Sequence, residues 1–311
     1  MSSNPFSTAA DLHVYRLRRR SLLLTSLALA ACQTAPPVPQ ASAPVPAPEP
    51  PRPVRIGLAL GGGAARGFAH IGVIQVLEEQ GIQPDLVVGT SAGSLVAALY
   101  AAGKSRTELR ALAETMDETA ITDWSFPLRG VIRGEALARY VNQQVGGVTI
   151  ERMKRPLGIV ATDLATGEPV LFRRGDTGMA VRASSAVPAV FQPVRIGDRE
   201  YVDGGLVSPV PVRFARQMGA DFVIAVDISS PPQDGPVGDA MRMLLQTFAI
   251  MGRSINHFEL READVVIRPA LNGLAGTDFR SRRLAMDAGR DAALAALPQL
   301  RERLAAKRRQ G

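Results

Sequence analysis

The sequence has few of the residues that form disulfides, metal sites and aromatic clusters. Cys32 is its one cysteine, histidine occurs three times, tryptophan once, and aromatic residues make up 5% of the 311 positions. A single thiol excludes an intramolecular disulfide and a cysteine-based metal site. Residues 1–31 hold four arginines and one aspartate, so the formal charge of +7 becomes +4 without them. This mild basic bias suits an anionic membrane surface and gives no indication of nucleic acid binding.

The apolar run at residues 22–31 is too short to cross a bilayer as a helix, which needs about 20 residues. Arginines at positions 16 and 18–20 precede it, and this order is typical of a secretory signal peptide. The run ends in Leu-Ala-Ala-Cys32, which resembles the bacterial lipobox, where the cysteine is lipidated and becomes the mature N-terminus. A plain signal peptide with an incidental cysteine is the alternative.

The residues around the expected cleavage site also predict a location. Gln33, in place of Asp, resembles the pattern that sorts lipoproteins to the outer membrane. We therefore expect a lipid-anchored protein of the bacterial cell envelope, in the outer membrane and facing the periplasm. The stretch 19–23, Arg-Arg-Ser-Leu-Leu, is a loose match to a twin-arginine signal, so the export route stays open.

Proline and alanine dominate residues 34–53 and favour an extended spacer without a packed core. The expected organisation is a signal peptide at 1–31, a lipidated Cys32 with a Pro/Ala-rich linker at 32–53, and a folded domain at 54–311. With 46% hydrophobic residues, the chain can bury one substantial core.

From residue 54 onward, short apolar runs alternate with stretches of helical periodicity. Such alternation predicts a mainly parallel sheet with helices on both faces, in which ligands bind at the carboxyl ends of the strands. The expected strands are 54–60, 85–88, 157–162, 170–172, 222–226 and 265–267, and the expected helices are 65–80, 92–102, 105–117, 134–145, 209–218 and 237–261.

The stretch Gly89-Thr-Ser91-Ala-Gly93 follows an expected strand and begins an expected helix. A G-x-S-x-G turn in that position exposes a serine nucleophile above the sheet, and the glycines leave room for the sharp turn. Ser91 is therefore the candidate nucleophile. A tight turn whose serine only caps the helix is the alternative.

An acyl-transfer serine also needs hydrogen-bond donors for the developing oxyanion. The glycine-rich turn at 61–67 enters a helix and leaves backbone N–H groups unpaired. We expect Gly62 and Gly63 to supply these donors, with Ala64 next. Arg66 has three open roles: it braces this loop, meets an anionic head group, or is simply solvated.

The general base is harder to identify. His13 lies in the segment expected to be removed, and His70 and His257 both lie on expected helices. A Ser-His-Asp triad stays open, but a serine–aspartate dyad is the more economical arrangement. Asp163, Asp203 and Asp227 all end apolar runs; Asp203 leads into a Gly-Gly turn, although spacing alone does not select it.

Together, three ordered motifs resemble those of patatin-like phospholipases: a glycine-rich loop at 61–67, a nucleophile elbow at 89–93 and Asp-Gly-Gly at 203–205. The stretches 161–169 and 183–188 are similar to the bacterial, neuropathy-target-esterase-like branch. The motif residues are Gly61, Gly62, Gly63, Arg66, Gly67, Gly89, Ser91, Gly93, Asp203, Gly204 and Gly205.

This resemblance implies a three-layer α/β/α fold over roughly residues 54–300 and hydrolysis of carboxylic esters in lipids, without metal or cofactor. The family roles fall on Ser91 as nucleophile, Asp203 as proton acceptor and the backbone of 62–64 as oxyanion hole. Ala64 is a departure, since many members have a further glycine there. Head group, acyl position and oligomeric state are not implied.

Alternatives remain at two levels. The apolar stripe of 237–261 either lines an acyl channel or forms a lid, or it is simply core. A glycine-rich turn after the first strand also occurs in dinucleotide-binding modules, but the acidic residue expected at the end of the second strand is missing. A catalytically silent lipid-binding or scaffolding protein of the envelope is the other alternative.

Overall fold

The computed structural model describes residues 53–116, 121, 123, 130–229, 238–274 and 278–310. The expected signal peptide, Cys32 and all of the proline-rich linker except Pro53 lie outside these residues. Among the helices described, none is both long enough and apolar enough to cross a membrane.

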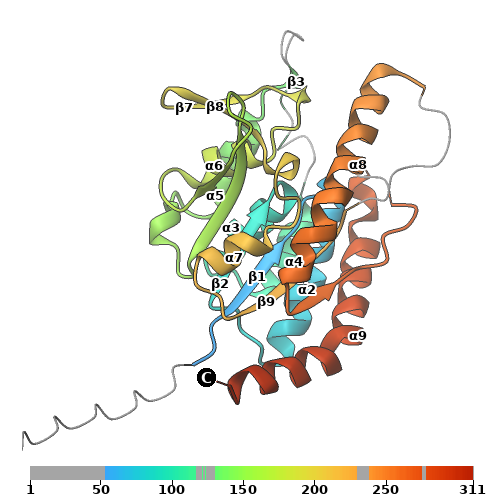
Figure 1. Cartoon of the computed structure of the whole chain (residues 1–311). Helices are drawn as coiled ribbons and strands as arrows, with labels where there is room; N and C mark the ends of the chain where they lie inside the picture. Colours follow the sequence, from blue (N-terminus) through green and yellow to red (C-terminus); the bar gives the residue numbers. More distant parts are fainter. Residues whose placement is uncertain are drawn as a thin grey trace, which may run out of the picture. The chain divides into compact units, whose positions relative to one another are not determined.

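The core of the fold is an eight-stranded sheet within the described residues (Figure 1). Its order is β10-β9-β1-β2-β4-β8-β7, with β5 paired to β4 outside this path. The first five strands of that order run parallel, whereas β5, β7 and β8 join by antiparallel pairing. The strands are β1 (Ile56–Leu60), β2 (Leu86–Thr90), β4 (Leu157–Asp163), β5 (Pro169–Phe172), β7 (Val194–Ile196), β8 (Arg199–Asp203), β9 (Phe222–Val226) and β10 (Val265–Ile267). Separately, β3 (Gly130–Ile132) pairs with β6 (Ala189–Phe191).

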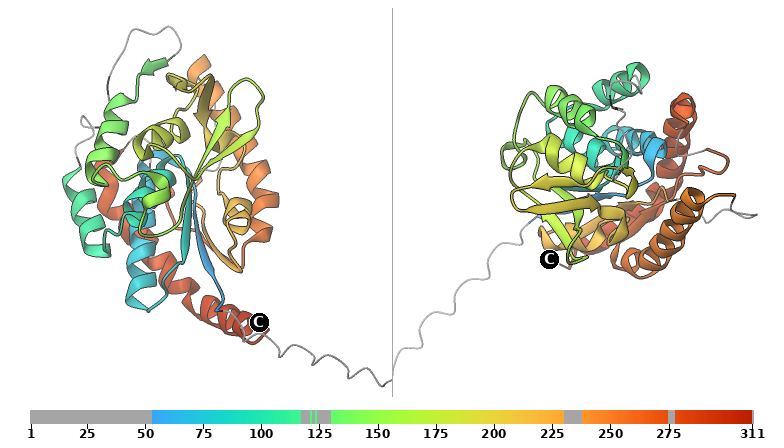
Figure 2. Two further views of the ribbon diagram at one scale, coloured as in Figure 1. Left: turned by 90° about the vertical axis from the view of Figure 1, so that its left-hand side faces the viewer. Right: turned by 90° about the horizontal axis from the view of Figure 1, so that it is seen from above.

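Helices cover both faces of this sheet, as the left view of Figure 2 shows with the sheet nearly edge-on. Successive side chains of a strand point to opposite faces. Leu58 and Leu60 accordingly join one hydrophobic cluster, and Ala59 joins the other. The first face packs against α2 (Phe68–Glu79), α3 (Ala92–Ala101), α4 (Arg106–Thr115), α5 (Glu135–Gln144) and α9 (Arg282–Arg308), and the second against α7 (Val212–Gln217). The expected three-layer α/β/α fold is therefore confirmed.

The sequence patterns located the parallel strands and most of the helices to within a few residues. They did not predict β3, β6, β7 and β8, the helix α6 (Thr177–Ser184), or the 27-residue helix α9. The α9 helix packs its small and apolar residues against α2 and the sheet. Its buried positions are Ala285, Met286, Gly289, Ala293, Leu297, Leu300 and Leu304.

The α2–α9 crossing depends on glycine. A Cβ added at Gly72 would collide with the backbone of Met286 and Arg290, and one added at Gly289 would collide with the backbone of Ala69. Neither contact can relax without separating the two helices. The two glycines thus set the distance between these helices.

We predict that Gly72→Ala destabilises the protein, against the usual trend. In a helix interior this change normally stabilises by about 1 kcal/mol, but here overpacking should cost about 1–3 kcal/mol. Denaturant unfolding measures the difference. Gly252→Ala is the matched control, because Gly252 also lies inside a helix and the Cβ it adds meets only Pro209 Cγ, at an ordinary 3.5 Å. A Gly72→Ala protein as stable as this control would contradict the close crossing.

The helix α8 (Ala240–Glu259) is not core, so that interpretation of its apolar stripe is wrong. Only Gly252, Asn256 and Glu259 are buried in it. Its large apolar side chains are instead exposed to solvent at Met241, Met243, Leu245, Ile250, Met251 and Phe258.

Candidate active site

Ser91 occupies a strained turn between β2 and α3. Its φ of 52° and ψ of −125° lie in a region that side chains rarely adopt. The glycines at either end make the turn possible, because a Cβ at Gly89 would collide with the backbone of Gly93, and a Cβ at Gly93 with that of Leu60. The serine hydroxyl is thereby held above the carboxyl end of the central strands.

The register of the sheet brings Asp203 to the same level. Thr90, the last residue of β2, pairs with Val160 of β4. The next residue of β4, Ala161, pairs with Asp203 at the end of the antiparallel strand β8. Ser91 and Asp203 therefore meet across β4, although 112 positions separate them in the chain.

The two side chains are in direct contact. Ser91 Oγ donates a hydrogen bond to Asp203 Oδ2 at 2.7 Å, and the N–H of Gly205 donates to Asp203 Oδ1 at 2.6 Å. The carboxyl group is buried, and burial raises its pKa from 3.8 to about 6 against the opposing effect of these two bonds. A carboxylate that is desolvated and aimed at a serine hydroxyl can act as its general base.

Ser184, the last residue of α6, holds the turn of the candidate nucleophile in place. Its hydroxyl accepts a hydrogen bond from the Ser91 N–H at 2.8 Å and donates one to the carbonyl of Val160 at 2.5 Å. In the sequence, Ser184 lies in the stretch 183–188 that is part of the family resemblance, and no signal there assigns it a role. A serine with two backbone partners across three elements is a positioning group.

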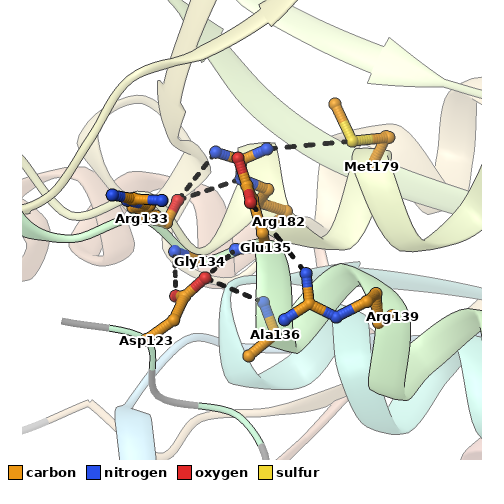
Figure 3. A network of polar contacts seen from close by, with 8 residues as sticks. All are labelled: Asp123, Arg133, Gly134, Glu135, Ala136, Arg139, Met179 and Arg182. Atoms are coloured by element: carbon orange, nitrogen blue, oxygen red, sulfur yellow. Dashed lines mark hydrogen bonds and ion pairs between the residues drawn. The ribbon is translucent and has the colours of Figure 1, made fainter. Parts of the chain in front are cut away.

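A polar network holds α6 in place (Figure 3). Arg182, two residues before Ser184, donates from Nε and a terminal nitrogen to the carbonyl of Arg133 at 3.0 and 2.8 Å. The carboxylate of Asp123 accepts from the N–H groups of Gly134, Glu135 and Ala136 at the start of α5. The segment before α5 is thereby tied to both helices.

We predict that Ser184→Ala lowers kcat about 10- to 100-fold and leaves KM nearly unchanged. The change removes the hydroxyl that holds the Ser91 N–H, so the nucleophile loses orientation, while no substrate contact is touched. Steady-state kinetics on a soluble ester measures the split. An effect on KM alone would show that Ser184 does not act through Ser91.

In the glycine-rich loop, two of the three expected oxyanion donors have a free N–H group among the described residues. The Gly62 N–H does not fit that role here, because it donates to the carbonyl of Pro209 at 2.9 Å. Among the described residues, the N–H groups of Gly63 and Ala64 have no acceptor. Ala64 adopts a φ of 50°, where glycine is favoured, which is consistent with the glycine that the family resemblance implies at this position.

Two side chains brace this loop. Arg66 Nε donates to the carbonyl of Gly63 at 3.2 Å, so of its three open roles the bracing one has a contact in the structure. His70 is completely buried, and its Nε2 lies 2.8 Å from the carbonyl of Gly61. Burial lowers the pKa of His70 to about 4, which keeps the ring neutral and leaves Nε2 to donate. Both side chains hold carbonyls of the loop, and the N–H groups of Gly63 and Ala64 remain available among the described residues.

The competing bases are occupied elsewhere. His257 lies on α8, where its Nε2 is 2.6 Å from a terminal nitrogen of Arg261. Asp227 forms an ion pair with Arg268, with Oδ2 and Nε 3.3 Å apart. Asp163 pairs with Arg199 at 2.6 Å and accepts the N–H groups of the following turn. Both aspartates therefore cap strand ends, and within the described residues Asp203 is the carboxylate in contact with Ser91.

The comparisons with known proteins all indicate one family. Residues 58–216 match the family model described as patatin-like phospholipase. An uncharacterised NTE family protein of Mycobacterium tuberculosis is 39% identical over 189 residues, which are 60% of this chain and 52% of that protein. The patatin-like phospholipase domain-containing protein 6 of Mus musculus is 36% identical over 183 residues, which are 56% of this chain and 14% of that protein. The chain spans about half the length of the mycobacterial relative.

Among solved structures, VipD from Legionella pneumophila is similar with a TM-score of 0.57 and 16% identity. The match covers 79% of this chain and 67% of VipD. At this level of identity the similarity shows a shared fold alone.

Proposed function

Because the chain belongs to the patatin-like phospholipase family, we propose that it is a serine hydrolase of carboxylic esters in lipids, with Ser91 and Asp203 as a catalytic dyad. The observation that carries this proposal is the 2.7 Å hydrogen bond from the strained serine to the buried carboxylate. Phospholipids and lysophospholipids are the expected substrate class, since the family model is that of a phospholipase.

The reaction follows from these contacts. Asp203 Oδ2 takes the hydroxyl proton as Ser91 Oγ forms a bond to the ester carbonyl carbon. The N–H groups of Gly63 and Ala64 donate to the oxyanion. Collapse of the tetrahedral intermediate breaks the ester bond, and the alcohol leaves with the proton from Asp203. Water then attacks the acyl-enzyme and gives a proton to Asp203. Collapse of the second tetrahedral intermediate breaks the bond to Ser91 Oγ and releases the carboxylic acid, and Asp203 returns the proton to Ser91 Oγ.

We predict that kcat/KM falls on the acidic side with an apparent pKa near 6. Asp203 accepts a proton only when ionised, and burial raises its pKa to about 6, so activity should drop about tenfold per pH unit below that value. A pH series with a soluble ester measures this limb. His257→Ala should leave the limb unmoved. A limb that shifts or vanishes in that variant would assign the base to histidine.

The decisive test of the class is covalent labelling. A fluorophosphonate probe should attach to Ser91, and peptide mapping should find the adduct on the 89–93 turn. The same protein should release fatty acid from phospholipid or lysophospholipid. A folded protein that resists the probe and is silent on every ester would support the lipid-binding alternative instead.

We also propose that Cys32 is lipidated and that the domain is held at the bacterial outer membrane, facing the periplasm. The sequence at 29–33 carries this proposal. Labelling with a radioactive fatty acid should mark the protein, and Cys32→Ser should abolish the label. Incorporation that persists in this variant would refute Cys32 as the lipidation site.

A further inference from the structure

The α8 helix presents large apolar side chains to solvent along two of its lines. Met243 and Ile250 are seven positions apart, as are Met251 and Phe258, and seven residues are close to two helical turns. Each pair therefore lies along one line of the helix. Phe258 is 67% exposed and Met243 59% exposed. Side chains of this size, gathered on one helix, mark an interaction surface.

The charge of the same helix shows what this surface suits. No acidic residue occurs from Ala240 to Phe258, whereas Arg242 and Arg253 lie eleven positions apart, about three turns, on a line beside the apolar ones. Within the described residues Arg253 forms no ion pair, and Arg242 has only a solvent-exposed one to Asp239 at 3.5 Å. An apolar stripe flanked by cations is typical of helices that lie in the interface of an anionic bilayer.

A basic pocket lies at the C-terminal part of α8. A pocket of about 620 Å³ is lined by Arg253, His257, Arg261 and Arg268, and among the described residues that line it Asp227 is the one acidic residue. Asn256 also lines it, and its Oδ1 is buried without a hydrogen-bond partner in the described structure. Guanidinium groups bind phosphate, and the unpaired oxygen can accept from a hydroxyl or ammonium of a head group.

This surface is coupled to the proposed catalytic turn. Ser208 Oγ donates to Glu259 Oε1 at 2.6 Å, and the carbonyl of Ser208 accepts from Thr90 Oγ1 at 2.9 Å. Thr90 directly precedes Ser91. Ser91 directly follows the carboxyl end of β2, and in Figure 1 α8 extends past the upper ends of the parallel strands.

We infer that α8 is a membrane-docking helix, which inserts its apolar stripe into a bilayer and binds anionic phospholipid head groups with its arginines. This inference rests on the proposed function in one respect only, that docking brings Ser91 to lipid esters. The docking itself is independent of catalysis.

Vesicle binding tests the inference directly. The full chain carries Cys32→Ser, to remove the proposed lipid anchor, and Ser91→Ala, to prevent turnover. Sedimentation is measured with phosphatidylcholine vesicles, with and without phosphatidylglycerol. We expect Met243→Glu with Ile250→Glu to weaken binding to the anionic vesicles at least about tenfold. Leu284→Glu is the matched control, since Leu284 is 63% exposed on α9, and it should stay within about twofold of the parent.

The arginines and the catalytic readout complete the test. Arg242→Gln with Arg253→Gln should reduce the preference for phosphatidylglycerol by about fivefold per arginine at low salt. With Ser91 intact, the α8 variants should hydrolyse a soluble ester normally and lose activity on vesicles. Vesicle binding equal to the parent would overturn the inference, even if the ester is hydrolysed. A change from dimer to monomer without loss of vesicle binding would assign α8 to self-association and overturn it as well.

Discussion

An Asp203→Asn variant is expected to lose ester hydrolysis by about 10³-fold or more while remaining folded. Asparagine is close to aspartate in shape, so its oxygen can keep the bond from the Gly205 N–H, and its amide can donate to Ser91 Oγ. It cannot accept the proton that the serine must release. Turnover of a soluble ester, measured beside circular dichroism, tests the prediction. Substantial residual activity would exclude Asp203 as the base.

The same substitution should not reduce stability at neutral pH. Burial raises the pKa of Asp203 from 3.8 to about 6, so the folded state disfavours the ionised form. At about 1.4 kcal/mol per pKa unit this opposes folding by roughly 3 kcal/mol above pH 6. As pH rises, the Asp203 carboxyl ionises in the unfolded chain at a lower pH than in the folded protein. Wild-type stability should therefore fall as pH rises from about 4 to 6. Asp203→Asn should lack this fall and equal or exceed the wild type at pH 7.5.

Asp163→Asn is the matched control, with the opposite sign. The hydrogen bond from Arg199 is the largest cause that lowers the pKa of Asp163, so its ionised form stabilises the folded state. Asp163 also ends a strand but does not contact Ser91. The control should therefore retain most activity and lose stability at neutral pH. If both variants lost stability equally, the ionised carboxylate of Asp203 would not oppose folding as proposed here.

How far the sequence predicts the site depends on the range of the contact involved. The nucleophile turn could be predicted because its determinants are local: an apolar strand, two glycines and a helix start within a few residues. The choice of Asp203 over Asp163 and Asp227 could not be made from spacing, since it depends on the pairing of Ala161 with Asp203 across two strands. The resemblance made that choice, and sheet register gives its physical reason.

The wrong or missing predictions have similar causes. The prediction of Gly62 as an oxyanion donor failed because its N–H donates to the carbonyl of Pro209, which is distant in the sequence. Periodicity identified α8 as an apolar helix but could not show that its large apolar side chains are exposed. By contrast, β8 had an available signal, because Gly197-Asp198 separates two short strand-like runs and is a typical hairpin turn.

Two substitutions at Ser91 should separate chemistry from strain. Ser91→Ala and Ser91→Gly both remove the nucleophile, and we expect each to lower turnover by about 10⁴- to 10⁶-fold. Their stabilities should differ. Alanine must keep the φ of 52°, whereas glycine adopts it freely, and such backbone strain costs about 1–3 kcal/mol.

The glycine variant should therefore be the more stable of the two, by about 1 kcal/mol after its larger loss of chain entropy is counted. In the wild type, the hydrogen bond from Ser91 lowers the pKa of Asp203. Both variants remove this bond, so the pKa of Asp203 should rise above its wild-type value. Denaturant unfolding across pH 4–8 measures both effects. Equal stabilities would mean that the nucleophile turn stores no strain, and an unchanged fall of stability with pH would mean that Ser91 and Asp203 do not share the proton.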